Sequence, residues 1–353
     1  MRKAFPGRLR KKFLMLSLVL GFIGGCARVG PVQPRRATQT KVLMGTYVTV
    51  DVCYERAEAV ALSNAYHDVW ARLEEVAGGM SIYDPQSEIS KLNHSYPDAV
   101  SVGHDLYYIL ESSIRLSELT QGAFDITVSP LVHLWRDAAK EERVPSKAQI
   151  ALAKDSVGVP SFELLEDQRA RLLKPGTSLD LGGIAKGYAV DEAARVLRSK
   201  GFKDFFIDAG GDLYVGGQSC KGTPWRIGIR NPARKDQIID IVEVRNQAVT
   251  TSGHYEQYFE IDGQSYSHII DPRTGVPQKG VVSATVIAPI ASEADALATA
   301  LCVLTEKEGL ELIEALGESY AALLIVPDPR LDNLKLMASL KYQAYRLPKV
   351  REF

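Results

Sequence analysis

Alternating apolar and polar residues predict strands at the start of the chain and through its second half. Over residues 43–54 every second residue from Met44 to Val52 lies on one face, as in a half-buried strand. Seven further short segments of this kind follow between residues 202 and 289. Asp262-Gly263 joins two of them and predicts a tight hairpin, and an apolar run over 320–326 predicts a last strand.

Helical spacing of apolar residues predicts helices on both sides of this strand-rich region. The predicted helices cover residues 55–77, 105–119, 146–157, 185–200 and 294–305. Gly78-Gly79 is expected to end the first helix, and Ser292 is expected to cap the last one. Helices that bracket a mostly hairpin-linked sheet indicate an α+β fold, with a mostly antiparallel sheet core and flanking helices.

The first 25 residues have the pattern of a bacterial lipoprotein signal peptide. Six basic residues between Arg2 and Lys12 precede the eleven apolar residues 13–23, which are too few for a spanning helix of about 20 residues. Ile23-Gly24-Gly25-Cys26 resembles a lipobox, which predicts cleavage before Cys26 and lipidation of its sulfur. The alternative is a plain signal peptide with an incidental cysteine.

The remaining chain divides into a short linker and one globular region. Residues 26–40 are rich in Pro, Arg and Gln without periodicity, so we expect a lipidated, flexible tether. The globular domain is expected over residues 41–328, with a C-terminal extension over 329–353.

Composition and charge narrow the class of protein. The 353 residues include 42 Lys and Arg, 43 Asp and Glu and 46% hydrophobic residues, which excludes collagen-like and disordered classes. Without the basic signal peptide the chain is acidic, so nothing favours binding to nucleic acid. Cys53, Cys220 and Cys302 would then remain, and an odd number at wide spacing is not a disulfide framework. Cys302 lies in an apolar helical run and is expected in the core.

Three segments carry residues suited to chemistry, each with a structural alternative. In residues 179–188 a strand ends at Gly182-Gly183 and a helix begins near Lys186, which suits an anion but also a simple tight turn. Asp295 and Thr299 lie four residues apart on one helix face, which suits a hard cation such as Mg²⁺, or helix capping and packing. His268 precedes an Asp-Pro-Arg-Thr-Gly turn and is a candidate base, or a structural histidine.

The order of the sequence blocks is more informative than any single block. The blocks are MGT (44–46), MSIY (80–83), GAFD (122–125), LDLGGIAKGYAVD (179–191), DAGGDLYVGG (208–217), SHIIDPRTG (267–275) and EADALATAL (293–301). This series resembles the ApbE-type FAD:protein FMN transferase family, once described as thiamine-biosynthesis lipoproteins. The resemblance runs from about Val42 to Val326 and includes the lipoprotein start.

The resemblance implies an activity, a cofactor and partners. Members of the family bind FAD with Mg²⁺, transfer the FMN moiety to a threonine or serine hydroxyl of a target protein, and release AMP. Typical acceptors are membrane redox subunits of the sodium-pumping NADH:quinone reductase and of Rnf-type complexes. The implied location is the periplasmic face of the bacterial inner membrane, with a lipid anchor at Cys26. The alternatives are a Mg²⁺-dependent FAD pyrophosphatase that yields FMN and AMP, and a non-catalytic FAD-binding lipoprotein.

The resemblance also implies roles for individual residues. Asp295, Thr299 and the carbonyl of Gly183 are the implied metal ligands, and His268 is the implied catalytic base. The implied contacts to FAD are Met44, Tyr83, Ala123, Phe124, Asp125, Asp180, Lys186 and Ile269.

Overall fold

The structure is a computed structural model that describes residues 34–234, 236–254, 258–328 and 333–347. The predicted signal peptide, Cys26 and residues 27–33 of the predicted tether lie outside the described residues. Within the described part of the chain, no helix is both long enough and apolar enough to span a bilayer.

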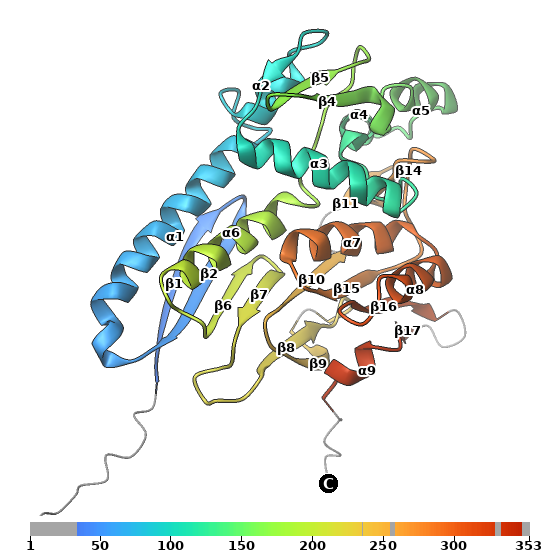
Figure 1. The fold of residues 1–353 in the computed structure, drawn as a ribbon. Helices are drawn as coiled ribbons and strands as arrows, with labels where there is room; N and C mark the ends of the chain where they lie inside the picture. Colours follow the sequence, from blue (N-terminus) through green and yellow to red (C-terminus); the bar gives the residue numbers. More distant parts are fainter. Residues whose placement is uncertain (1–33, 235, 255–257, 329–332, 348–353) are drawn as a thin grey trace, which may run out of the picture. The chain divides into compact units, whose positions relative to one another are not determined.

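An eight-stranded antiparallel sheet forms the centre of the fold (Figure 1). In spatial order its strands are β1 (Arg35–Leu43), β2 (Thr46–Tyr54), β6 (Phe205–Ala209), β7 (Asp212–Gly216), β10 (Gln247–Gly253), β15 (Ser283–Ala288), β16 (Ala321–Asp328) and β17 (Asn333–Ala338). Every neighbouring pair is antiparallel, which confirms the α+β prediction.

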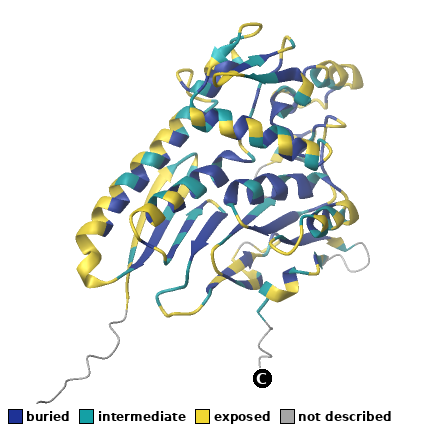
Figure 2. Ribbon diagram, viewed as in Figure 1, coloured by how far each residue is buried: buried dark blue, intermediate teal, exposed yellow. Residues whose placement is uncertain are grey.

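Long helices cover one face of this sheet. They are α1 (Ala59–Met80), α6 (Ala185–Ser199) and α7 (Ala291–Val303), and α3 (His104–Leu119) packs on α1 and α7. Val48, Val50 and Val52 of β2 alternate toward these helices and are buried against them. Figure 2 shows the difference between α1, which is exposed along its outer side, and α7, which is dark blue along most of its length. The helix layer and the sheet therefore enclose the main core.

A hairpin and a short helix cover part of the opposite face. The hairpin is formed by β8 (Trp225–Arg230) and β9 (Ile238–Val244), and the helix is α9 (Tyr342–Tyr345). β8 buries every second residue, beginning with Trp225, against the sheet, and Tyr342 is fully buried in the same cluster. Strands covered on both faces must be apolar on both, which explains the unbroken apolar run Ala321–Val326 in β16.

Smaller elements connect and extend these layers. They are η1 (Arg56–Glu58), α2 (Glu88–Asn93), β3 (Val100–Ser101), η2 (Ile126–Val128), α4 (Ser129–Lys140), α5 (Lys147–Lys154), η3 (Val159–Ser161), β4 (Phe162–Leu165), β5 (Arg169–Leu172), β11 (Tyr258–Ile261), β12 (Gln264–Ser267), β13 (Ile270–Asp271), β14 (Val276–Pro277) and α8 (Glu306–Ala315). The predicted Asp262-Gly263 hairpin joins β11 to β12, and both residues have the positive φ that such a turn requires.

The structure adds ordered residues to the predicted domain at both of its ends. Residues 35–40, predicted as tether, belong to β1, an edge strand held to β2 by Arg36 and Thr38, whose side chains bond the buried Asp51. At the other end, β17 pairs with β16 and α9 packs on the sheet, so residues 333–347 belong to the domain. β1 carries mostly polar side chains and lacks the apolar alternation by which a strand is recognised.

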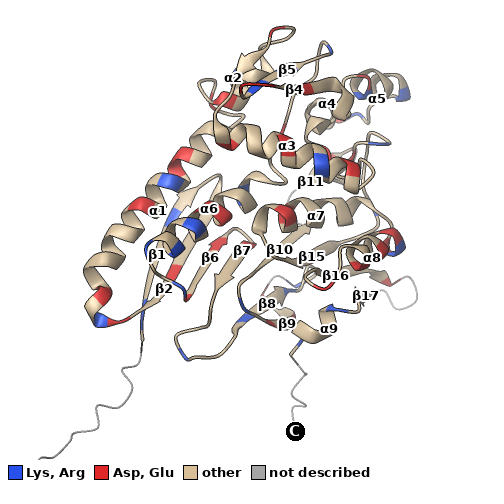
Figure 3. Cartoon of the chain, viewed as in Figure 1, with Lys and Arg blue, Asp and Glu red and all other residues tan. Residues whose placement is uncertain are grey.

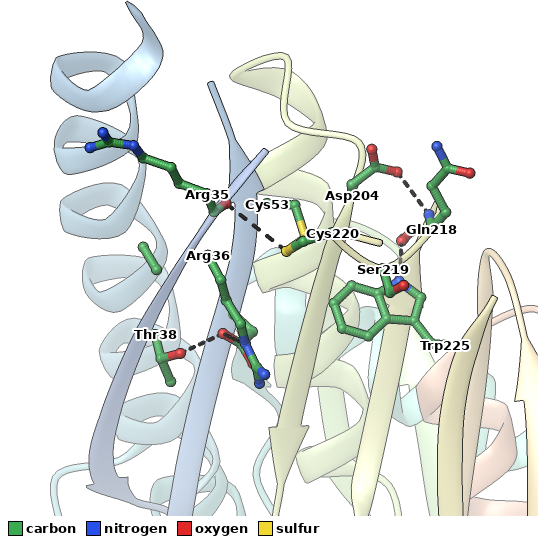
Figure 4. The surroundings of a disulfide bond; sticks show 12 residues. Arg35, Arg36, Thr38, Cys53, Asp204, Gln218, Ser219, Cys220 and Trp225 are labelled. Atoms are coloured by element: carbon green, nitrogen blue, oxygen red, sulfur yellow. Dashed lines mark hydrogen bonds and ion pairs between the residues drawn. A yellow bond between two sulfur atoms is a disulfide. The ribbon is translucent and has the colours of Figure 1, made fainter. Parts of the chain in front are cut away.

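Cys53 and Cys220 form a disulfide, contrary to the prediction of no disulfide framework (Figure 4). The bond joins the end of β2 to the loop after β7, across 167 residues of sequence. The chain-entropy treatment gives about 5 kcal/mol as an upper value for a loop of this length. Cys302 is buried in the core, as predicted.

Three predicted element boundaries are also wrong. The single strand predicted over residues 43–54 is instead a hairpin of β1 and β2, because Met44 and Gly45 take positive φ and form a turn. Gly78-Gly79 does not end α1, which continues to Met80. α7 begins at Ala291 rather than Ala294, and no side chain caps it from its N-cap position.

Candidate functional site

Two tight turns meet at one end of the central sheet. Met44-Gly45 joins β1 to β2, and Gly210-Gly211 joins β6 to β7, which is adjacent because β2 pairs with β6. A Cβ on Gly210 would lie 2.4 Å from the Thr46 hydroxyl oxygen, so only glycine allows the turns to approach this closely. The MGT and DAGGD blocks therefore form one surface.

The loop before α6 is fixed at this same end of the sheet. Both the N–H and the carbonyl of Leu179 bond the side-chain amide of Asn93 from α2, at 2.7 and 2.9 Å. Asp180 donates its N–H to the Ile126 carbonyl at 2.7 Å and accepts from the Gly182 N–H at 2.9 Å. The Gly182-Gly183 turn is thus held on both sides before α6 begins.

Gly183 brings that loop against α7. A Cβ on Gly183 would lie 3.0 Å from Thr299 Oγ1 and 3.4 Å from the ring of Phe124. Thr299 Oγ1 also lies 3.3 Å from Ser252 Oγ of β10. Two of the predicted metal ligands, Gly183 and Thr299, therefore lie side by side, with a predicted FAD contact packed against them.

Lys186 joins two buried carboxylates. Its ammonium group pairs with Asp212 of β7 and with Asp295 of α7, the latter at 3.4 Å. Asp295 Oδ2 also accepts from the Gly187 N–H at 3.2 Å. Burial by itself opposes the charge on Lys186, but attraction to Asp295 and Asp212 outweighs it and raises the pKa of the lysine above its ordinary value. Figure 3 shows how few charged residues the central strands and α7 carry.

These residues form a donor set that fits a hard cation. Asp295 supplies a carboxylate, and the neighbouring Thr299, Ser252 and Gly183 supply oxygen atoms, which Mg²⁺ prefers. Asp295 is 1% exposed, so its charge must be balanced from within the protein or by a bound cation. No group of three or more His, Cys, Asp and Glu side chains suited to a metal occurs among the described residues, consistent with a set that relies on hydroxyl and backbone oxygens.

The GAFD segment lies next to this cluster but its carboxylate already has partners. Ala123 and Phe124 are buried, and Asp125 accepts hydrogen bonds from the Thr127 N–H at 2.8 Å and its hydroxyl at 2.6 Å. Burial raises the pKa of Asp125 above its ordinary value despite these bonds. Asp125 therefore shapes the loop, whatever further contact it makes with a ligand.

The SHIIDPRTG segment packs beside GAFD. His268 is half-buried between β12 and β13, and Ile269 is buried, donating its N–H to Ser267 Oγ at 3.0 Å. Arg273 pairs with Asp271, and its side chain lies 3.6 Å from where a Cβ on Gly122 would be. A cavity of about 310 Å³ separates residues 271–280 from the junction of α7 and α8.

The remaining predicted contacts lie at the surface. Met44 is half-buried in the β1–β2 turn, and Tyr83 is 81% exposed on the loop after α1. Sequence reasoning missed Asp212 and Ser252 as members of the site. Asp212 follows a Gly-Gly turn and Ser252 lies inside a strand, so neither stands out until the sheet places it opposite Lys186 or Thr299.

Comparison with known proteins gives a consistent family match. The model of the ApbE family matches residues 44–324. A FAD:protein FMN transferase of Vibrio cholerae is 35% identical over 308 residues, covering 86% of this chain and 90% of that protein. The corresponding Escherichia coli protein is 30% identical over 343 residues, covering 94% and 96%.

Solved structures agree with the sequence comparison. The flavin transferase ApbE from Vibrio cholerae superposes with a TM-score of 0.77 at 31% identity, covering 88% of this chain and 99% of that one. The ApbE protein from Thermotoga maritima gives a TM-score of 0.78 at 31% identity, covering 89% and 100%.

Proposed function

The chain belongs to the ApbE family, and on that premise we propose that it is a Mg²⁺-dependent FAD:protein FMN transferase. The observation that carries the proposal is the cluster of Lys186, Asp295 and Thr299 beside Gly183, because it offers a cation and hard oxygen donors at one place. FAD contains a pyrophosphate, which needs both.

The proposed reaction exchanges the phosphoanhydride bond of FAD for a phosphoester bond to the acceptor. The hydroxyl oxygen of an acceptor threonine or serine bonds to the phosphorus of the FMN moiety, the bond to the bridging oxygen breaks, and AMP leaves. Mg²⁺ bound by Asp295, Thr299 and the Gly183 carbonyl would supply charge neutralisation at the phosphates. Lys186 would hold the pyrophosphate by its charge, and His268 would accept the hydroxyl proton.

The other predicted contacts would bind the rest of FAD. We propose that Met44, Tyr83, Ala123, Phe124, Asp125, Asp180 and Ile269 surround the nucleotide. The N–H groups of Ile184, Ala185 and Gly187 already donate to Leu181 and Asp295, so Lys186 is the main anion contact at this helix start.

We also propose the predicted setting: lipid anchorage through Cys26 on the periplasmic face of the inner membrane, with membrane redox subunits of NADH:quinone reductase or Rnf-type complexes as acceptors. The Cys53–Cys220 disulfide supports an oxidising compartment, where such bonds persist.

The test incubates the full chain with FAD, Mg²⁺ and a purified candidate acceptor subunit, with EDTA as the control. An EDTA-sensitive gain of one FMN on the acceptor, seen by intact mass and in-gel fluorescence, is expected. Free FMN and AMP without an adduct would instead establish the pyrophosphatase, and FAD binding without any product would leave a binding protein.

A further inference from the structure

Asp191, on α6, is a carboxylate with no assigned role in the proposed reaction. Its Oδ1 accepts the Ala291 N–H at 2.7 Å, and its Oδ2 accepts the Ser292 N–H at 2.9 Å and the Ser292 hydroxyl at 2.8 Å. These are the first residues of α7, whose N-cap position has no side-chain hydrogen bond of its own. Asp191 therefore caps a helix that lies 100 residues further along the chain.

A second contact joins the same two helices one turn further on. Gly187 precedes Asp191 by one helical turn on α6, and its N–H donates to Asp295 Oδ2 at 3.2 Å. A Cβ on Gly187 would lie 2.3 Å from the Ala291 carbonyl oxygen, so α6 and α7 touch through their backbones. One face of α6 thus holds α7 at its first turn and at Asp295.

We infer that Asp191 is a positioning residue, which sets the start of α7 so that Asp295 and Thr299 face the Gly183 loop. The inference rests on the proposed function, because it concerns the residues proposed to hold Mg²⁺. Asp191 acts through backbone groups of α7 and is not a ligand itself. Partners that orient metal ligands from outside the coordination sphere commonly change metal affinity by about 10–100-fold when removed.

Asp191→Asn is the variant that tests this positioning role most directly. An asparagine keeps the size of the side chain but has one acceptor oxygen, so its NH₂ group would face one of the two N–H donors of α7. Burial also raises the pKa of Asp191 to about 6, which means that the charged carboxylate is held at some expense in stability. A role confined to stability would therefore not require the charge.

Thr305→Ala provides the matched control. Thr305 caps α8 from that helix's own N-cap position, accepting the Glu308 N–H at 3.3 Å in a capping box, and α8 carries none of the proposed ligands. Both variants remove helix-capping hydrogen bonds from adjacent helices. Only Asp191→Asn should affect the ligands on α7.

The experiment measures Mg²⁺ binding to the FAD-loaded full chain by calorimetry, with amide exchange over residues 291–295 as a second readout. For D191N we expect a Kd for Mg²⁺ about 10-fold weaker, faster exchange at the start of α7, and a kcat that recovers at saturating Mg²⁺. For T305A we expect unchanged Mg²⁺ binding and faster exchange in α8 only.

The two hypotheses fail in different ways. A D191N protein with the Mg²⁺ affinity and the α7 exchange rates of the wild type would overturn the positioning role. If the wild type binds no Mg²⁺ while D191N still loosens the start of α7, the metal assignment is wrong and the positioning of α7 stands. If T305A lost as much Mg²⁺ affinity as D191N, the effect of Asp191 would be one of general stability and not of positioning α7.

Discussion

The two ends of β2 are built for different purposes. At the Thr46 end, glycine turns bring backbones together, and the neighbouring cluster of Lys186, Asp212 and Asp295 buries charge. At the Cys53 end, a disulfide and the bonds from Arg36 and Thr38 to Asp51 tie the edge of the sheet in place. Cross-linking adds stability, so we expect the Cys53 end of β2 to stabilise the fold and the Thr46 end to carry the proposed site.

Asp295→Ala should have the largest effect on activity. It removes the only carboxylate among the proposed ligands, and we expect flavin transfer to fall by at least about 10³-fold in single-turnover assays. Asp137→Ala, which removes an exposed ion pair on α4, is the control and should leave the rate unchanged. Wild-type transfer by the Asp295 variant would exclude the metal assignment.

His268→Ala tests the proposed catalytic base. Loss of a general base should lower kcat by about 10²-fold or more while leaving FAD affinity unchanged. The measurement is the rate against pH with a saturating acceptor, and the basic limb seen in the wild type should disappear. A full kcat in the variant would place the base elsewhere.

Asp212→Asn and Lys186→Met test whether the buried charges act as a unit. Each single change removes one partner of the Lys186–Asp212 ion pair and so alters how the lysine is held, so each should weaken FAD binding, and the double variant should lose less than the sum of the two. Binding is measured by flavin fluorescence at fixed Mg²⁺. Strict additivity would mean that the Lys186–Asp212 contact contributes nothing to binding.

Breaking the disulfide at the Cys53 end of β2 should affect stability alone. Replacing Cys53 and Cys220 by serine should lower the free energy of unfolding by about 2–5 kcal/mol, measured by denaturant titration, and leave kcat unchanged. Cys302→Ser, a buried thiol without a disulfide, is the control for polar substitution in the core. A selective loss of kcat in the double variant would contradict the separation of the two ends.

The smallest effect concerns pH and Asp191. Its pKa is about 6 in the folded protein and lies near the ordinary value of 3.8 when unfolded, so the folded state binds the extra proton. Its contribution favours the folded wild type below pH 4 and is lost as the pH rises to about 6. The melting temperature of D191N relative to the wild type should therefore rise across that range, and a flat difference would contradict the raised pKa.

Local patterns predicted much of this fold. Apolar spacing placed α3 and α6 to within one residue at each end, and an Asp-Gly pair placed the β11–β12 hairpin. Two of the errors arise where a distant partner decides: the cap of α7 comes from Asp191, and the pairing of Cys53 with Cys220 depends on the sheet.

The residues of the candidate site also depend on partners that are distant in the sequence. Lys186 and Asp295 lie 109 residues apart, so spacing alone could not bring them together, and only the family resemblance grouped them. Asp212 and Ser252 escaped because their neighbours, Lys186 and Thr299, lie on helices distant in the sequence. The role of His268 as a base, the metal ligands and all of the implied contacts with FAD stay predictions, since the fold does not test them.

The disulfide has a mechanical consequence. If the chain hangs from a bilayer by its N-terminus, any pull enters the domain at Arg35, at the free edge of the sheet. An edge strand pulled from its end separates from its neighbour one hydrogen bond at a time. The Cys53–Cys220 link lies at that very end, where Cys220 Sγ is 4.0 Å from the Arg35 carbonyl oxygen, and it carries load from β2 into the middle of the sheet. The link does not hold β1 itself, so such a pull would be resisted first by the β1–β2 hydrogen bonds and by the bonds of Arg36 and Thr38 to Asp51, and the covalent link would resist the separation of β2 from the rest of the sheet.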